Sequence, residues 1–147
     1  MDGAANLAQQ LIEVIWNGGD REAAREIVSE GVDVHPSRSV GPGPDGQAAV
    51  GDYFRSGFPD ARWVVEDAFG EGDKAVVRWR MTGRHDGPFE GVPPTGTVVE
   101  FAGITVVRID SGRIAEIWHA EDLFGLFAQI GARPVAGIPD DGGISGG

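Results

Sequence analysis

The sequence predicts an α+β fold, in which helices come first, antiparallel strands follow, and one helix closes the chain. Two observations predict it. Apolar residues recur at helical spacing near residues 3–17, and from residue 61 onward the period of the pattern changes to two. Turn signals at residues 70–73 and 110–112 separate the alternating runs. We expect such a long sheet to curl around the helices as a cone-shaped α+β barrel and to leave an apolar pocket between the layers.

Three helices are expected before the sheet. The first has Leu7, Leu11 and Ile15 on one face and ends at residues 17–19, where glycine can adopt a left-handed C-cap. Asp20 is expected to cap a second helix that ends at residue 31, and Asp45 a third that ends at residues 59–60. A short alternating segment at residues 32–35 and a loop rich in glycine and proline lie between the last two helices.

Four alternating segments then predict strands near residues 61–69, 74–85, 97–109 and 113–119. In the first, Trp63 and Phe69 fall on the same side. In the second, Trp79, Met81 and His85 share the side that we assign to the pocket, because the other side carries arginines. Apolar residues at 123–130 predict a closing helix that ends at residue 131.

The length of 147 residues fits one domain, which we expect to span residues 1–131. Residues 132–147 are rich in glycine and proline, and with so little apolar surface to bury they are expected to form a flexible tail.

The formal net charge of −11 argues against nucleic acid and anionic membranes as partners, because both are bound through Lys and Arg. No apolar run approaches the ~20 residues of a membrane span, and we expect a cytoplasmic protein. A small neutral or weakly acidic organic ligand and another protein both remain open as partners. The chain has no cysteine and three scattered histidines, so neither disulfides nor a metal site is expected.

Ionisable groups gather at the predicted junction between the last strand and the closing helix. Asp122 opens the helix, and it is either an N-cap or a carboxylic acid that transfers protons inside the pocket. His119 should point to the opposite face from Trp118, where it is either a packed residue or one that binds a substrate carbonyl group or tunes Asp122. Glu121 is expected to be solvated at the start of the helix.

The other candidates lie along the strands and helices. His85 either holds a carbonyl or enolate oxygen or is a satisfied core histidine, and His35 either projects into the cavity or packs structurally. The remaining candidates for substrate contact have the core as their alternative role; they are Tyr53, Phe58, Trp63, Trp79, Met81, Phe101 and Trp118.

An arginine strip and a long loop are the two notable features expected at the surface. The arginine strip of the second strand, Arg78, Arg80 and Arg84, is expected to pair with Glu100 and Glu116 on neighbouring strands or across a dimer interface. The loop at residues 86–96 is either a plain strand connection or a rim over the pocket.

Several segments resemble the SnoaL-like polyketide cyclases, within the nuclear transport factor 2-like superfamily. They include Phe58-Pro59-Asp60, Gly83-x-His85-x-Gly87, the run from Gly91 to Gly96, and Arg113-Ile-x-Glu-x-Trp118 followed by Asp122. In this order and spacing they cover residues 35–131.

The resemblance implies a cone-shaped fold, a homodimer formed through the outer sheet face, and a pocket for a hydrophobic polycyclic or ester-bearing ligand. It also implies an intramolecular aldol ring closure without a metal or an organic cofactor, with the acidic side chain matching Asp122 as acid/base. His119 and His85 would hold the developing oxyanion. The alternatives are a cofactor-free hydroxylase, an isomerase, or a ligand-binding protein without turnover, because fold alone does not fix function.

Overall fold

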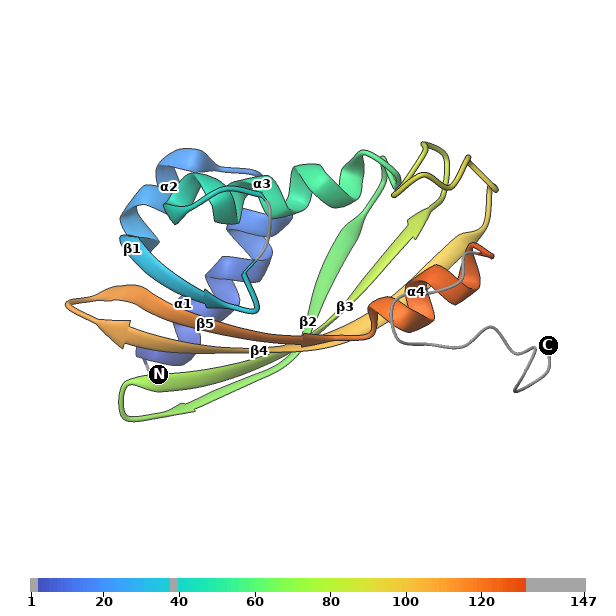
Figure 1. Cartoon of the computed structure of the whole chain (residues 1–147). Helices are drawn as coiled ribbons and strands as arrows, with labels where there is room; N and C mark the ends of the chain where they lie inside the picture. The colour runs from blue at the N-terminus through green and yellow to red at the C-terminus, as the bar shows by residue number, and fades with distance from the viewer. Residues whose placement is uncertain (1–2, 38–39, 132–147) are drawn as a thin grey trace.

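The structure, a computed structural model, describes residues 3–37 and 40–131. Five strands form one open sheet in the order β1-β5-β4-β3-β2, and the helices α1, α2 and α3 cover its inner face (Figure 1). The sheet curls strongly, so that β2 and β3 rise beside the end of α3 while α4 lies at the opposite end from the N-terminus (Figure 1). The predicted α+β fold is confirmed.

The elements follow the predicted order. The helices are α1 (Gly3–Gln10), the π-helical segment η1 (Leu11–Trp16), α2 (Arg21–Ile27), α3 (Gly43–Arg55) and α4 (Leu123–Gln129). The strands are β1 (Val28–His35), β2 (Arg62–Glu71), β3 (Lys74–Arg84), β4 (Val98–Asp110) and β5 (Arg113–Glu121). No helix in this described part of the chain is both long and apolar enough to cross a membrane. The predicted tail, 132–147, lies outside the described residues.

Two helix boundaries differ from the prediction. Asp20 does cap α2, since its side chain accepts a hydrogen bond from the Ala23 amide at 3.0 Å, but the helix ends at Ile27. The residues from Val28 onward form β1 instead, because they pair in parallel with β5, a long-range partner that local periodicity does not reveal. The prediction that Asp45 caps α3 is also wrong, since Pro42 holds the N-cap position.

Two β-bulges change which residues face inward. In β2 the register shifts between Val65 and Asp67, so Trp63 is buried while Phe69 is 55% exposed on the outer face. The expectation that these two side chains share a face is therefore wrong, because one extra residue reverses the alternation. In β5 the pairing changes between Ile114 and Glu116, and the strand continues in regular register beyond it.

Trp16 lies at the centre of the core on the inner face. Its ring centroid is 6.0 Å from that of Trp63 and 5.5 Å from that of Trp79, both in edge contacts. The Trp79 indole lies against β4 at Gly103, where a Cβ atom would come within 2.3 Å of the ring. Glycine at this position therefore allows the indole to reach across the strand.

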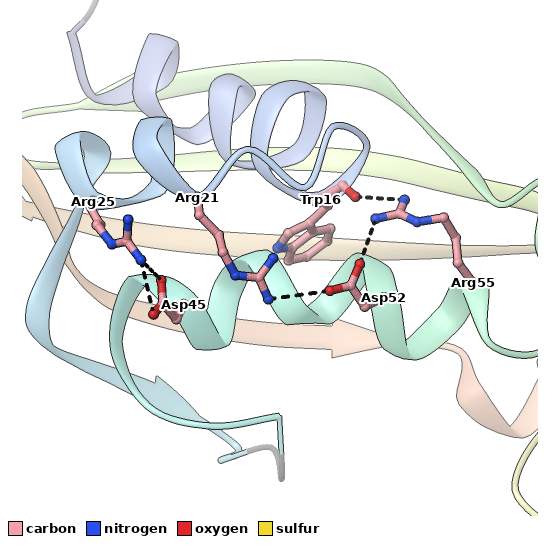
Figure 2. A network of polar contacts seen from close by, with 6 residues as sticks. All are labelled: Trp16, Arg21, Arg25, Asp45, Asp52 and Arg55. Carbon is pink, nitrogen blue, oxygen red and sulfur yellow. Dashed lines mark hydrogen bonds and ion pairs between the residues drawn. The ribbon is translucent and has the colours of Figure 1, made fainter.

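A polar network holds Trp16 in place (Figure 2). The Arg55 guanidinium donates hydrogen bonds to the carbonyl oxygens of Trp16 and Asn17, at 3.1 and 3.2 Å, which satisfies two acceptors at the end of η1. Two exposed ion pairs join α2 to α3, namely Arg25–Asp45 at 3.1 Å and Arg21–Asp52 at 3.5 Å. Exposed pairs contribute little to stability, so the Arg55 contacts matter more for fixing η1.

Side-chain amides cover two free strand edges. The Asn17 amide donates to the Trp63 carbonyl at 2.7 Å and accepts from its N–H at 2.8 Å, along the outer edge of β2. The Gln129 amide forms the same pair of bonds with Glu100 of β4, at 2.9 and 3.0 Å. The edge of β4 that faces β5 has no strand partner at Glu100, because β5 ends opposite Gly103. Each amide substitutes for a neighbouring strand, and the second fixes α4 against the sheet.

The arginine strip lies on the outer face and pairs in part as expected. Arg80 bonds the carboxylate of Glu100 at 2.7 Å and also that of Glu66, and these hydrogen bonds raise the pKa of Arg80. Glu116 does not pair with the strip; it accepts from Arg108 at 3.0 Å instead.

Candidate active site

His119 lies on the inner face of the sheet, near the centre of the fold. It is paired with Thr105 of β4, and residues paired across strands point to the same face. Its Nδ1 atom is 3.3 Å from the Thr105 hydroxyl oxygen, and its ring centroid is 5.5 Å from that of Trp16. One ring nitrogen of His119 therefore points towards Thr105 in the sheet, and Trp16 of η1 packs against the ring.

A second hydrogen bond fixes the orientation of Thr105. The Trp79 indole donates to the Thr105 hydroxyl oxygen at 3.0 Å, and Thr105 is fully buried. Since an indole N–H can only donate, it occupies a lone pair and leaves the hydroxyl hydrogen free to bond His119 Nδ1. In that arrangement the neutral imidazole carries its proton on Nε2. The chain Trp79–Thr105–His119 thus orients the histidine.

A cavity of about 540 Å³ lies between β1 and the start of α3. Its walls include Val32 and Val34 of β1 and Gln47 of α3. Gln47 is 2% exposed, and its side-chain oxygen accepts a hydrogen bond from the Trp16 indole at 3.3 Å. Trp16 therefore contacts both Gln47 and His119. Its indole lies between Gln47, which lines the cavity, and the histidine ring.

The two acidic residues at the end of β5 are placed differently. Asp122 is exposed, and its carboxylate accepts a hydrogen bond from the Gly125 amide at 2.8 Å as the N-cap of α4. Both Glu121 and Asp122 border a hollow of about 460 Å³, which Arg78 also lines. Glu121 is half-buried and is paired with Gly103, whose position on β4 faces inward. The structure thus gives Asp122 the capping role and places Glu121 on the same face as His119.

His85 is fully buried at the other end of the inner face. Its Nδ1 accepts a hydrogen bond from the Thr95 amide at 3.2 Å, so the proton of the neutral ring is on Nε2. Among the described residues Nε2 has no hydrogen-bond partner, and the Phe58 ring lies 5.3 Å away between centroids.

His85 and His119 do not meet. The backbone N–H of His85 bonds the carbonyl of Thr97, which directly precedes β4, whereas His119 is paired with Thr105 within β4. These two partners are eight positions apart in the sequence, which is roughly 26 Å of extended chain. One substrate oxygen cannot contact both rings.

The loop between β3 and β4 closes the His85 end. Phe89 is 2% exposed and inserts into a cluster of rings, with centroid distances of 5.1–5.9 Å to Tyr53, Phe54, Phe58 and Phe127. The Tyr53 hydroxyl also bonds the Glu90 carboxylate in the same loop. The loop is therefore packed into the core by an aromatic side chain.

The other predicted contact residues divide between the two faces of the sheet. Five are buried on the inner side, as strand parity and helix periodicity indicated; they are Phe58, Trp63, Trp79, Met81 and Phe101. His35 and Trp118 are paired between β1 and β5 and lie on the outer face, with stacked rings 5.7 Å apart. His35 Nε2 lies 2.8 Å from the Glu116 carboxylate, away from the cavity.

Sequence reasoning missed several residues of this region. Gln47 and Thr105 carry a detectable signal, since each is a polar residue on an otherwise apolar face of its element. Trp16 follows Ile12 at helical spacing, which marks it as a residue on the buried face but does not reveal its contact with the site. Phe89 lies in a loop, where no periodicity marks a buried side chain. Within residues 3–37 and 40–131 no group of three or more His, Asp or Glu side chains is arranged to hold a metal ion.

A sequence model of the SnoaL-like polyketide cyclase family matches residues 6–130. The chain therefore belongs to this family. No curated protein gives a significant match.

Solved structures agree with the family assignment. A candidate SnoaL-like polyketide cyclase from Jannaschia sp. CCS1 is 32% identical, with a TM-score of 0.75 over 90% of this chain and 94% of the other. TsrD from Streptomyces laurentii is 29% identical, with a TM-score of 0.75 over 90% and 98% of the two chains. IdmH, a candidate polyketide cyclase from Streptomyces antibioticus, is 30% identical, with a TM-score of 0.73 over 88% and 99%.

Proposed function

We propose that this protein catalyses an aldol-type ring closure of an aromatic polyketide-like substrate, without a cofactor, at His119. The observation that carries the proposal is the placement of His119, which is oriented by Thr105 and Trp79 on the inner face. The cavity beside Gln47 supports it, because Gln47 bonds the Trp16 indole, and the Trp16 ring in turn contacts the imidazole. Family membership supplies the reaction class.

The reaction requires a carbon acid flanked by carbonyl groups. A carboxylate removes the proton, and the electron pair is delocalised onto a carbonyl oxygen as an enolate. The enolate carbon then bonds to a second carbonyl carbon, whose oxygen becomes an alkoxide and takes up a proton. His119 Nε2–H would stabilise the oxyanion, an interaction that is strong where water is scarce. The resemblance assigns the carboxylate role to Asp122, and that assignment remains a prediction.

Two further parts of the expectation stay proposals. His85 was expected to share the oxyanion, and its distance from His119 along β4 favours the alternative of a core histidine. A homodimer through the outer sheet face is supported by exposed apolar side chains there, including Val64, Phe69 and Ile104.

The proposed function is tested with a tricyclic aromatic ketone that carries a 3-oxo-ester side chain. We expect the wild-type protein to accelerate ring closure and His119→Gln to lose about 10²–10⁴-fold in kcat/KM while retaining the fold. Ligand binding without any acceleration by the wild-type protein would favour the non-catalytic alternative. Full activity of His119→Gln would remove the histidine from the mechanism.

A further inference from the structure

We infer that Gln47 is a specificity-determining residue, whose side-chain amide donates a hydrogen bond to an uncharged carbonyl oxygen of the substrate. The inference rests on the proposed function, because it names a group that holds the same substrate. It arises from a polar side chain of α3 that borders the cavity between β1 and α3 although the residue is only 2% exposed.

The bond to Trp16 fixes which way the Gln47 amide is turned. An indole N–H can only donate, so the atom that accepts from it at 3.3 Å is the amide oxygen. The amide nitrogen, with its two hydrogens, therefore points away from this bond. Among the residues that the structure describes, no acceptor bonds this nitrogen. Amide hydrogens of buried residues are nearly always bonded in proteins, so these two are available to a ligand.

The cavity supplies the space for that ligand. Its volume of about 540 Å³ lies within the range of small-molecule sites. Val32 and Val34 of β1 form an apolar part of its wall; both are half-buried, and Val34 is paired with the buried Ile117. A polar group that lies beside apolar side chains fixes the orientation of a ligand, and the Gln47 amide is such a group.

The charge of the wall favours an uncharged acceptor. Asp33 also lines the cavity, so a ligand carboxylate would meet a like charge there. A ketone or ester carbonyl oxygen accepts from an amide N–H without adding charge, and such oxygens recur along a polyketide-like substrate. The cavity therefore suits a carbonyl group of the substrate better than an acid group.

The same amide connects the cavity with the proposed reaction centre. Its oxygen holds the Trp16 indole, and the Trp16 ring lies 5.5 Å from the His119 ring between centroids. A carbonyl group bound to the amide nitrogen is thus held by the side chain that also fixes Trp16. Gln47 selects and orients the substrate in this account and takes no part in proton transfer.

The test uses two ligands of the same shape. 2-Acetylnaphthalene has a carbonyl oxygen where 2-isopropenylnaphthalene has a CH₂ group, and dissociation constants are measured for both. Gln47→Met keeps the length of the side chain without a donor, and Gln47→Glu keeps an oxygen for the Trp16 indole. Gln9→Glu is the matched control, because it makes the same change in a residue that bonds Glu13 and does not line the cavity.

We expect both Gln47 variants to bind the ketone about three- to tenfold more weakly than the wild-type protein does. Binding of the alkene should change by less than about twofold, and Gln9→Glu should match the wild-type protein with both ligands. 2-Naphthoate, which has a carboxylate in place of the methyl ketone, should bind the wild-type protein more weakly than the ketone. Circular dichroism checks that each variant is folded, and either Gln47 variant suffices for the comparison.

A second measurement reports the hydrogen bond itself. The ¹³C signal of a labelled carbonyl carbon should move downfield when 2-acetylnaphthalene binds the wild-type protein or Gln9→Glu. In Gln47→Met this shift should be lost, which a purely structural role of Gln47 would not predict.

Equal weakening of both ligands in the Gln47 variants, or no carbonyl shift on binding to the wild-type protein, would overturn the inference. Tighter binding of 2-naphthoate than of the ketone would overturn the assignment of an uncharged group. Ring closure by the wild-type protein with unaltered ketone binding by the variants would refute the role of Gln47 and leave the proposed function intact. Selective ketone binding through Gln47 without any ring closure would instead remove the proposed function and keep the binding role.

Discussion

The two histidines of the inner face have similar partners and different surroundings, since His85 is fully buried and His119 is half-buried. In both, a threonine hydroxyl oxygen lies near Nδ1, at 2.9 Å for His85 and Thr95 and at 3.3 Å for His119 and Thr105. His85 is enclosed where the loop between β3 and β4 packs against the core. The His119 ring contacts Trp16, whose indole bonds Gln47 in the wall of a cavity. The difference leads us to expect that access, burial and neighbouring groups together decide which of the two histidines contacts a substrate.

The largest effect is expected from Phe89→Ala, which removes the ring that closes the His85 end. Deleting a buried phenyl ring destabilises a protein by about 3–5 kcal/mol, and Phe89 is 2% exposed among four other rings. Chemical denaturation measures the loss. Turnover per folded molecule should be retained. Loss of turnover in a sample that is still folded would show instead that the substrate binds near this loop.

A smaller loss of stability is expected from His85→Phe. The substitution keeps a ring in place but removes the Nδ1 acceptor, so the Thr95 amide loses its bond at 3.2 Å. This bond is part-buried and Thr95 itself is exposed, so its loss should cost about 0.5–1.5 kcal/mol. Equilibrium unfolding would show this change with kcat/KM unaltered. A selective fall in kcat/KM with unchanged stability would reverse the assignment of roles to the two histidines.

Thr105→Val should impair turnover at the His119 end by roughly tenfold, equivalent to about 1.4 kcal/mol of barrier. Valine matches the shape of threonine but cannot link the Trp79 indole to His119. Thr105→Ser restores the hydroxyl and should recover most of the rate, which a purely steric role would not predict. The pH–rate profile of each variant distinguishes an altered histidine from altered substrate binding. Equal rates in all three proteins would contradict the orienting role.

The smallest effect concerns the outer face. Hydrogen bonds from His35 and then Arg108 lower the pKa of the Glu116 carboxyl below its ordinary value of 4.5. A lowered folded-state pKa stabilises the protein above the ordinary value, and this stabilisation is lost as the pH falls through the lowered pKa. The melting temperatures of the wild-type protein and Glu116→Gln should therefore differ near pH 6 and converge near pH 3. A difference that grows on acidification would contradict the sign.

The sequence allowed correct prediction wherever a strand continued without interruption. Trp79, Met81 and His85 share the buried face of β3 as expected, and His119 lies opposite Trp118 across β5. Phe69 was misplaced because the bulge in β2 reverses the alternation, and nothing local in the sequence marks it.

The roles at the end of β5 depended on where the strand stops. Glu121 was expected in solvent because the helix was thought to begin there, yet the strand continues through it and keeps it on the inner face. Asp122 was recognised as either a cap or an acid, and only the path of the chain into α4 shows its side chain bonded to Gly125. The polar pair Gln47 and Trp16 joins α3 to η1, a long-range contact that periodicity cannot supply.

The central claim, that substrate binds at the His119 end, is tested most directly by titrating the protein with ethyl benzoylacetate and following side-chain NMR signals. The chain has only three histidines, so few ring signals have to be assigned for this purpose. The account predicts that the signals of His119 and the Gln47 amide shift with the same saturation curve, while His85 and His35 do not respond. A saturable shift of His85 with His119 unmoved would contradict it.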